Sequence, residues 1–392
     1  MIYRFLLSLS LIAPFLASCF PQAAPAALTP DLDVIMTQAF ATVHAVATAT
    51  AWSLAPAATP TASPTPLVPR TPPALPPPYQ TDLLAPFVTP HQYIQDPCQY
   101  LRARWDPNNA VPGTIVLVIM FHGIQKATAQ VTDPKNISSK DFKKLMNDLH
   151  EMGFTAITTQ QLADFLYTNA RIPQRSVVLI VDDRKYAENF NTWFRPYWEK
   201  WGWPVINGWI SAFGGQDPVL AENVALEREG WVDHQAHGVV HNIPMSDNSS
   251  EEFIRGELQG SIEVFQQYYG KTPIAIIWPG GGFGVRPVRI ARELGYKLGF
   301  TVNPRGPLMF NWIPQADTDD LANPYDIAEG PIGDPLMTLP RYWDTDAAAK
   351  LDDIRRLGNQ AAAYAEQNKV VELEYYDIVC APTLGPLPTA VP

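Results

Sequence analysis

The sequence has no block of basic residues and only three cysteines. Lysine and arginine together number 28, against 39 aspartate and glutamate residues, so the net charge is −11 and the pI is about 5.1. Proteins that bind nucleic acid or an anionic membrane face usually carry a basic patch, so this composition argues against both as the main partner. The apolar fraction of 46% is ordinary for a folded core. A chain of 392 residues can form two average domains, or one α/β barrel with extra segments.

The apolar run at the start of the chain is too short for a comfortable membrane span. Residues 1–19 instead resemble an export signal, with Arg4 as the positive start, residues 5–15 as the apolar core and small residues before Cys19. The LASC sequence that ends on Cys19 resembles a bacterial lipobox, in which the cysteine becomes the lipidated first residue. We therefore expect an exported protein, lipid-anchored to the outer face of a bacterial cell membrane. The alternative is an ordinary secretory signal with a chance cysteine, which predicts a secreted protein.

Proline is abundant, and most of the excess lies near the two ends of the chain. Its 39 residues are about twice the average usage. Residues 20–90 are rich in alanine, proline and threonine, as in TPTASPTP and TPPALPPP. Because proline lacks a donor and fixes φ, and little of this segment could be buried, we predict a disordered, semi-extended tether. Residues 381–392 have the composition of a flexible tail, which leaves 91–380 as the predicted folded domain.

The remaining cysteines, Cys98 and Cys380, lie close to the two boundaries of that domain. If Cys19 is lipidated, they are the only pair available in an oxidising compartment, and we expect a disulfide between them. The bridge would join the start of the folded domain to its last strand. Two free thiols are the alternative, because the sequence does not show how far apart the residues lie.

Strand and helix signals alternate between the two cysteines. The expected strands cover residues 114–120, 154–157, 177–181, 274–278 and 298–302. The expected helices cover residues 139–152, 159–167, 218–229, 250–269 and 285–294, and a final helix and strand cover 347–379. Repeated β–α units indicate a parallel sheet, and their number favours a barrel over an open sheet. The polar motifs described next follow strands, which is where such a barrel has its catalytic rim.

An acidic pair, Asp182 and Asp183, ends the apolar strand that begins near Val177. Neighbouring side chains of a strand point to opposite sides, so one acid can bind a cation while the other handles a proton. Such a pair alone is more often a turn or a helix cap. The HGVVH sequence changes this judgement, because its four-residue spacing lets His237 and His241 face a single ion.

Three motifs, in this order, resemble the first three motifs of the polysaccharide deacetylase family (carbohydrate esterase family 4, the NodB homology domain). They are Asp182-Asp183, HGVVH and WPGGG. The segment MFHGI and residues 141–166 and 291–302 are similar to the branch that deacetylates exopolysaccharide or peptidoglycan amino sugars. The resemblance covers about residues 112–341. It implies a distorted (β/α) barrel, a divalent metal (usually zinc), and hydrolysis of N-acetyl or, less often, O-acetyl groups on an extracytoplasmic glycan.

Residue roles follow from the matched positions. The resemblance implies that Asp183, His237 and His241 bind the metal and that Asp182 is the general base. The nucleophile would be a metal-bound water, whose pKa zinc lowers from ~15.7 toward ~7.

The third motif is expected to line the substrate site. Trp278, Pro279, Gly280 and Gly281 belong to it, and the glycines allow the close backbone approach that an oxyanion hole needs. A plain turn is the alternative interpretation of this segment.

The chain departs from the family pattern at several positions. Arg184 stands where glycine is usual, and beside a metal it would repel the cation or bind an anionic substrate group. Gly238 replaces serine or threonine, Ile277 replaces an arginine, and Ile180 and Val181 replace threonine and phenylalanine.

No clear late Leu-x-His motif is present, so the general acid has to come from elsewhere. His122 is the first candidate and Asp334 the second, although a hydrogen-bonded structural histidine is an equal alternative for His122. His234 is expected at the surface or in support of the site. Arg341 either replaces the absent arginine or pairs with an acid, and we favour the pairing.

Five tryptophans crowd one segment, at positions 193, 198, 201, 203 and 209. Exposed indoles can stack on sugar rings, but most rings of this size fill core and loop contacts, so we expect one or two at most to line a glycan subsite.

Two functions from different classes therefore remain open. The first is a membrane-tethered, metal-dependent polysaccharide deacetylase. The second is a catalytically degenerate relative that serves as a glycan-binding cell-surface module. The retained Asp183, His237 and His241 favour the enzyme, whereas Arg184 and the missing general acid favour the binding module.

Overall fold

The computed structural model describes residues 70–125, 131, 135–212, 217–241, 243–320 and 327–390. The export signal, the lipid-anchor cysteine Cys19 and residues 20–69 of the predicted tether lie outside the described residues. Within the described ranges, no helix combines the length and the apolar composition that crossing a membrane requires.

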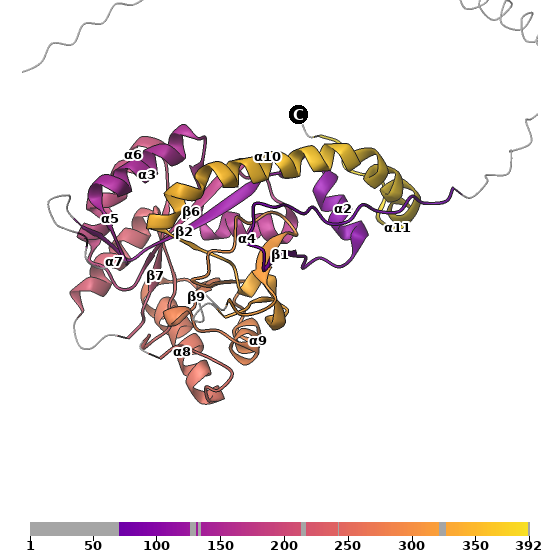
Figure 1. Ribbon diagram of the computed structural model, residues 1–392. Coiled ribbons are helices and arrows are strands. Elements are labelled where there is room, and N and C mark those ends of the chain that lie inside the picture. Colours follow the sequence, from indigo (N-terminus) through magenta and orange to yellow (C-terminus); the bar gives the residue numbers. More distant parts are fainter. Residues whose placement is uncertain are drawn as a thin grey trace, which may run out of the picture. The chain divides into compact units, whose positions relative to one another are not determined.

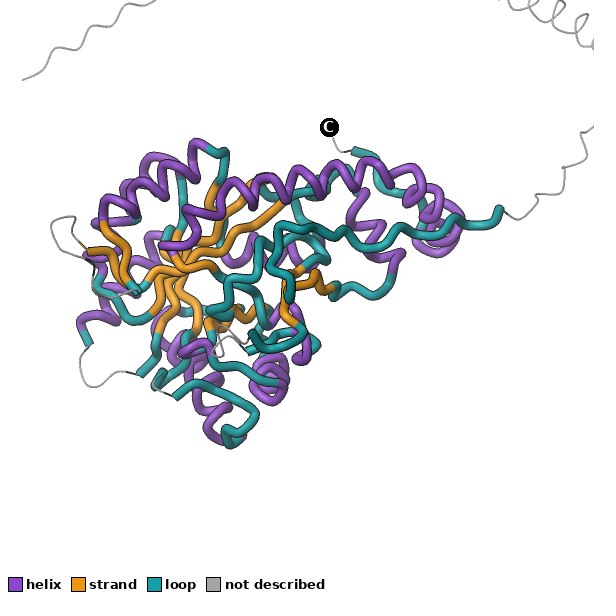
Figure 2. Tube along the Cα trace, in the orientation of Figure 1, coloured by secondary structure: helices purple, strands orange, loops and turns teal. Residues whose placement is uncertain are grey.

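A parallel sheet forms the centre of the domain (Figure 1, Figure 2). Its strand order is β10-β9-β8-β7-β6-β2-β12, and β5 pairs with β6 beside this path. These strands are β2 (Ile115–Phe121), β5 (Thr155–Ala156), β6 (Arg175–Asp182), β7 (Val205–Trp209), β8 (Val232–Ala236), β9 (Ala275–Ile277), β10 (Leu298–Phe300) and β12 (Tyr342–Trp343). Two small sheets pair β1 (Val88–His91) with β11 (Ile313–Ala316) and β3 (Gly123–Gln125) with β4 (Asn136–Ser138).

The central strands are buried on both faces, which explains their continuous apolar sequences. All seven residues of β2 are buried, as are all residues of β6 after Arg175. Such runs are typical of parallel strands that helices cover on the outside. The sheet curls so far that residues 339–343 contact both of its edges. Leu339 forms a bridge with Phe300 of β10, and β12 pairs with β2. The predicted α/β architecture, a distorted barrel, is confirmed.

Helices pack around the sheet. They are α2 (Pro97–Trp105), α3 (Ser139–Glu151), α4 (Thr159–Thr168), α5 (Ala187–Trp193), α6 (Arg195–Trp201), α7 (Pro218–Glu229), α8 (Glu251–Val264), α9 (Val285–Glu293), α10 (Asp344–Tyr375) and α11 (Ala381–Leu384). Of these, α3, α4, α7, α8, α9 and α10 lie close to predicted positions, whereas α2, α5, α6 and α11 were not predicted. Short 3-10 or π turns are η1 (Phe265–Tyr269), η2 (Pro279–Gly281), η3 (Gly330–Ile332), η4 (Pro335–Met337) and η5 (Tyr376–Cys380). Side-chain N-caps fix several starts, including Ser138 for α3 and Asp217 for α7.

The end of the domain differs from the prediction. A final helix and strand were expected over 347–379, but α10 and η5 are helical throughout. The reason is a helical period of buried residues along α10, which includes Leu351, Ile354 and Leu357. The disulfide between Cys98 and Cys380 is present, and it joins α2 to η5 rather than to a strand.

Both predicted flexible segments pack on the domain where the structure describes them. Residues 70–90 were assigned to the tether, yet β1 pairs with β11 and Arg70 forms ion pairs with Glu374 and Asp377. The Tyr79 ring lies 5.6 Å from that of Tyr364 on α10. Residues 381–390 also contact the domain: Arg102 of α2 donates to the carbonyl of Leu384 in α11, and Asn108 donates to that of Thr389. Proline content did not reveal these contacts because they depend on strand pairing and a few aromatic rings.

Candidate active site

Four predicted site residues meet at one edge of the curled sheet because each follows a parallel strand. Asp182 is the last residue of β6 and Asp183 comes next; His237 directly follows β8, and His122 directly follows β2. The carboxyl ends of parallel strands lie at the same edge, which is where barrels of this kind carry their reactive groups.

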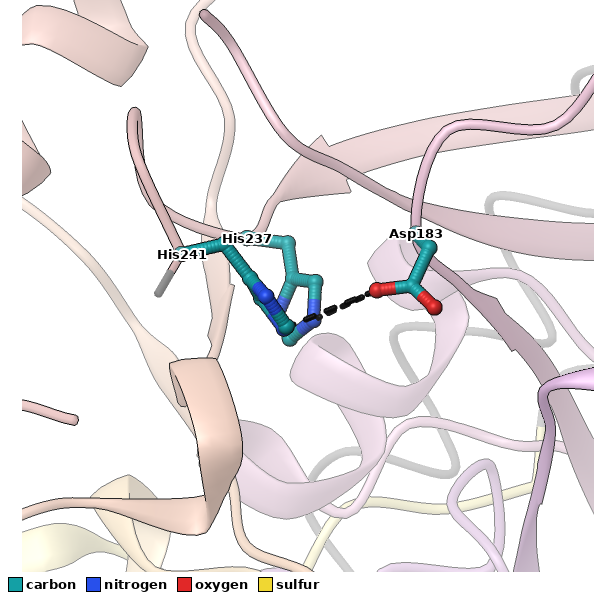
Figure 3. Close-up of side chains that lie close together, drawn as sticks. All are labelled: Asp183, His237 and His241. Carbon is teal, nitrogen blue, oxygen red and sulfur yellow. Dashed lines mark ion pairs between the residues drawn. The ribbon is translucent and has the colours of Figure 1, made fainter. Parts of the chain in front are cut away.

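Asp183, His237 and His241 form a cluster that could hold a metal ion (Figure 3). The Oδ1 atom of Asp183 lies 3.8 Å from Nε2 of His237 and 3.5 Å from Nε2 of His241. Their potential ligand atoms all lie within 4.8 Å of one another. Three ligands of a tetrahedral zinc ion would be about 3.3 Å apart, given bonds of about 2.0–2.1 Å. Small side-chain shifts would therefore bring the cluster around an ion.

The histidine orientations also fit a metal. Nδ1 of His237 contacts the carbonyl oxygen of Ile277 at 2.7 Å, and donation to that oxygen leaves the Nε2 lone pair facing Asp183. Burial lowers the pKa of His237, which keeps the ring neutral, as a ligand must be. Asp183 and His241 both have positive φ angles, 72° and 67°, that non-glycine residues seldom adopt. Backbone strain of this kind concentrates at functional sites.

Arg184 does not face the cluster, although its place next to Asp183 in the sequence suggested that it would repel a metal ion there. Its guanidinium forms an ion pair with Asp217, the N-cap of α7, and lies 4.8 Å from the Trp209 ring centre. Among the described residues, the lysine that contacts the cluster is Lys185, whose Nζ lies 3.7 Å from Oδ2 of Asp183.

Asp182 forms a buried ion pair with Arg341. Nη1 of Arg341 donates to Oδ1 of Asp182 at 2.7 Å, and Nε donates to the carbonyl of Thr301 at 2.6 Å. Burial alone would raise the pKa of Asp182, but Arg341, with His237 and His122, outweighs it and lowers the pKa to about 2. The favoured interpretation of Arg341, pairing with an acid, is correct, and this arginine is buried rather than positioned to contact substrate.

His122 lies on the other side of Asp182. Its Nε2 is 3.5 Å from Oδ2 of Asp182, and its ring stacks on Trp343 with centres 4.9 Å apart. Burial lowers the pKa of His122. Its Nδ1 is buried and has no hydrogen-bond partner among the described residues. His122 is thus the one predicted acid candidate that reaches the site.

The second acid candidate and part of the third motif are used elsewhere. The Asp334 carboxylate is bound by Arg292 at 2.7 Å, and among the described contacts none joins it to Asp182, Asp183, His237 or His241. Trp278 is fully buried and its indole donates to the Met337 carbonyl, so it lines no substrate site.

The turn Pro279–Gly281 follows β9, as predicted, but the amide of Gly281 donates within the turn, to the carbonyl of Trp278. Proline has no N–H, so Gly280 is the residue of this turn that remains the expected oxyanion donor.

Residues that the sequence did not single out support the HGVVH turn. The buried Glu257 carboxylate of α8 accepts from the backbone N–H groups of Val239 and Val240. Gly238 has a φ of 74°, and a Cβ there would lie 2.6 Å from Glu257 Oε2. The glycine thus replaces the family's hydroxyl residue because the carboxylate fills that space. No local sequence signal links Glu257 to the turn.

Most of the tryptophans belong to the core, as predicted. Trp203 and Trp209 are buried, and Trp201 stacks on His150 with ring centres 4.0 Å apart. Trp193 lines an open groove beside Lys185. His234 is fully buried, with its ring nitrogens bound to Glu227 and Asn223, in support of the strand rather than at the surface.

Comparison with known families agrees with this geometry. Residues 170–299 match the family described as Polysaccharide deacetylase. The match contains the acidic pair, both histidines of HGVVH and the third motif. The resemblance to the polysaccharide deacetylase family is confirmed. His122 and Arg341 lie outside the matched residues, so their roles depend on the structure.

Individual relatives are distant. YxkH of Bacillus subtilis (strain 168), provisionally named a polysaccharide deacetylase, is 22% identical over 188 residues, which are 48% of this chain. The matched part spans 64% of that relative's length.

Solved structures with partial similarity include two deacetylases. The Streptococcus pyogenes deacetylase PplD, in complex with acetate, has a TM-score of 0.45 and 20% identity over 58% of this chain and 92% of that chain. The BpsB deacetylase domain of Bordetella bronchiseptica has a TM-score of 0.42 and 18% identity over 61% and 97%.

Proposed function

We propose that the protein is a metal-dependent deacetylase that removes N-acetyl, or O-acetyl, groups from an extracytoplasmic polysaccharide or peptidoglycan amino sugar. The observation that carries this proposal is the cluster of Asp183, His237 and His241 beside the buried carboxylate of Asp182. A neutral imidazole pair and one carboxylate suit a divalent ion such as zinc and leave it an open position.

The residues around the cluster divide the reaction between them. A bound divalent cation would polarise the acetyl carbonyl and make a water acidic enough to attack it at neutral pH. Asp182 accepts the proton of that water, because Arg341 keeps it ionised over the physiological pH range. A carboxyl group with a pKa of about 2 does not retain a proton. His122, whose Nε2 lies 3.5 Å from Oδ2 of Asp182, takes up that proton and gives one to the leaving amine.

The tetrahedral oxyanion needs donors that are already in place. The backbone N–H of Gly280 is our candidate, because Gly280 lies in the turn after β9, the strand whose last residue, Ile277, binds His237.

A groove beside the cluster suits a polymeric substrate. It has a volume of about 810 Å³, and one of its lining residues is Lys185, whose Nζ lies 3.7 Å from Oδ2 of Asp183. Its lining includes Trp193 and the 63%-exposed ring of Tyr186, together with exposed amide and carboxylate side chains of α5. Aromatic faces with nearby hydrogen-bonding groups suit sugar rings. We infer that neighbouring sugars of the glycan lie here.

The experiment is acetate release from N-acetylglucosamine oligomers and from peptidoglycan by the zinc-loaded protein. We expect release by the wild type and a loss of at least ~100-fold in Asp182→Asn and His122→Asn, since general acid–base catalysis contributes ~10²–10⁴-fold. Asp148→Asn, at a half-buried acid of α3 that pairs with Lys144 outside the cluster, is the matched control and should retain full activity. Oligomer binding without acetate release from any substrate would support the glycan-binding alternative instead.

We also propose that the protein is exported and tethered to the cell membrane through lipidated Cys19. The Cys19→Ser variant should move from the membrane fraction to the medium. An unchanged distribution would refute the anchor.

A further inference from the structure

Asn207 lies in the middle of β7, between the strand that carries the acidic pair and the strand that leads to His237. It is fully buried. Its Nδ2 donates to the carbonyl oxygens of Val181 at 2.9 Å and of Asp183 at 3.0 Å. One amide group thus binds the backbone on both sides of Asp182.

The backbone needs this support because regular strand pairing ends there. The register between β6 and β7 stops at Asp182 and Gly208. Asp183 lies beyond it with a φ of 72°, a conformation that costs a non-glycine residue about 1–3 kcal/mol unless its surroundings hold it. Asp183 lies beyond the last residue pair of β6 and β7, so without Asn207 its carbonyl would have no partner from strand pairing.

A second side-chain amide binds the backbone of the loop that follows Asp183. Asn223 of α7 donates through Nδ2 to the carbonyl of Lys185 at 2.8 Å. The carbonyls of Val181, Asp183 and Lys185 are therefore each held by a side-chain amide. This leaves the Asp183 carboxylate pointing at the two histidines (Figure 3).

Asn207 also carries a desolvation penalty, because one of its polar atoms, Oδ1, is buried without a hydrogen-bond partner among the described residues. A buried unsatisfied acceptor costs about 1–3 kcal/mol, and an apolar residue of the same size would avoid it. The two donated hydrogen bonds are what only the amide provides.

We propose that Asn207 is a positioning residue that fixes Asp183 in the geometry for metal binding. The inference rests on the proposed metal site and assigns a residue outside every sequence motif to it. Asn207 donates to the backbone carbonyls of Val181 and Asp183, so it acts on the Asp183 carboxylate through that backbone.

The test is the zinc dissociation constant of chelator-stripped protein, measured by competition with a chromophoric chelator. Asn207→Ala should weaken zinc binding by roughly 10- to 100-fold, the usual effect of removing a group that orients a ligand. Saturating zinc should then restore most of the acetate release, with KM for the oligomer unchanged. If Asn207 were only a structural residue, saturating zinc would not restore acetate release in Asn207→Ala.

Asn169→Ala is the matched control. Asn169 is also buried, and its Nδ2 donates to two carbonyls, those of Ala103 at 2.9 Å and Ala110 at 3.1 Å. It lies at the C-terminal end of α4, outside the cluster. We expect both variants to lower the melting temperature, but only Asn207→Ala to weaken zinc binding. If Asn207→Ala does not fold, Asn207→Ser, which keeps one donor, should show a smaller weakening in the same assay.

The outcomes separate the two proposals. Wild-type zinc affinity in a folded Asn207 variant overturns the positioning role and leaves the metal site intact. Absence of zinc binding by the wild type overturns the metal site itself.

Discussion

The buried pair of Asp182 and Arg341 makes the sharpest prediction about stability. Asp182 is 2% exposed and Arg341 is 0% exposed, and their contact is 2.7 Å. Arg341→Met keeps an unbranched apolar side chain but removes the guanidinium and its charge, so the Asp182 carboxylate stays buried without a cation. Breaking one side of a buried pair typically costs about 3–5 kcal/mol, and we expect a loss of this size in the free energy of unfolding.

The double variant decides whether the pair is the cause. Asp182→Asn leaves the guanidinium of Arg341 unpaired and should also destabilise, whereas Asp182→Asn combined with Arg341→Met removes both charges. We expect the double variant to be more stable than the sum of the single effects predicts, by about 2 kcal/mol or more. Urea denaturation followed by tryptophan fluorescence measures all four proteins.

A second buried pair in the same domain provides the control. Arg305 contacts Glu329 at 3.0 Å, and both side chains are almost fully buried. Arg305→Met should cost comparable stability but leave acetate release per folded molecule unchanged, whereas Arg341→Met should lower both. Strictly additive effects of Asp182→Asn and Arg341→Met would refute the reasoning, because they would show that the two charges do not stabilise each other.

Three further predictions concern other parts of the domain. The Asp344 carboxylate has no side-chain hydrogen-bond partner among the described residues, and its burial raises its pKa from 3.8 to about 7. The folded state therefore keeps this proton to a higher pH than the unfolded state does, so stability falls as pH rises between those values, by up to about 4 kcal/mol. Asp344→Asn should therefore be more stabilising at pH 8 than at pH 5 in urea denaturation, and an equal effect at both pH values would contradict this. Cys98→Ser should cost about 2–5 kcal/mol by opening the link to Cys380, and reductant should destabilise the wild type but not the variant. Gly238→Ser should lower the melting temperature and the acetate release, because its Cβ would displace Glu257 and its φ of 74° disfavours serine; a variant as stable as the wild type would refute this.

Much of the fold was predictable because its signals are local. The run from Val177 to Val181 is apolar and β-branched, and it became a buried strand. The helix at 218–229 was predicted with the observed bounds, because a proline and a glycine mark its two ends. The cluster of Asp183, His237 and His241 was predictable for the same reason, since each ligand belongs to a short motif that follows a strand.

The parts that were missed depend on contacts between distant residues. Arg184 was expected to repel a metal or to bind an anionic substrate group, but Asp217, which lies 33 residues later, forms an ion pair with Arg184. Glu257 and Asn207 support the site through backbone groups, for which no spacing in the sequence gives a signal.

The segment at 70–90 was misjudged because its proline content predicts an extended chain, and an extended chain can still pair as a strand, as β1 does.

We propose that deacetylation depends on a metal bound by the cluster of Asp183, His237 and His241. The most direct measurement is a zinc titration of the chelator-stripped protein with acetate release from N-acetylglucosamine oligomers recorded at each point. We predict that release rises in proportion to added zinc and levels off at a single ion per chain, and that His237→Ala shows neither tight binding nor release. Acetate release that is independent of zinc, or stoichiometric zinc binding that survives in His237→Ala, would show that the cluster is not the metal site of the reaction.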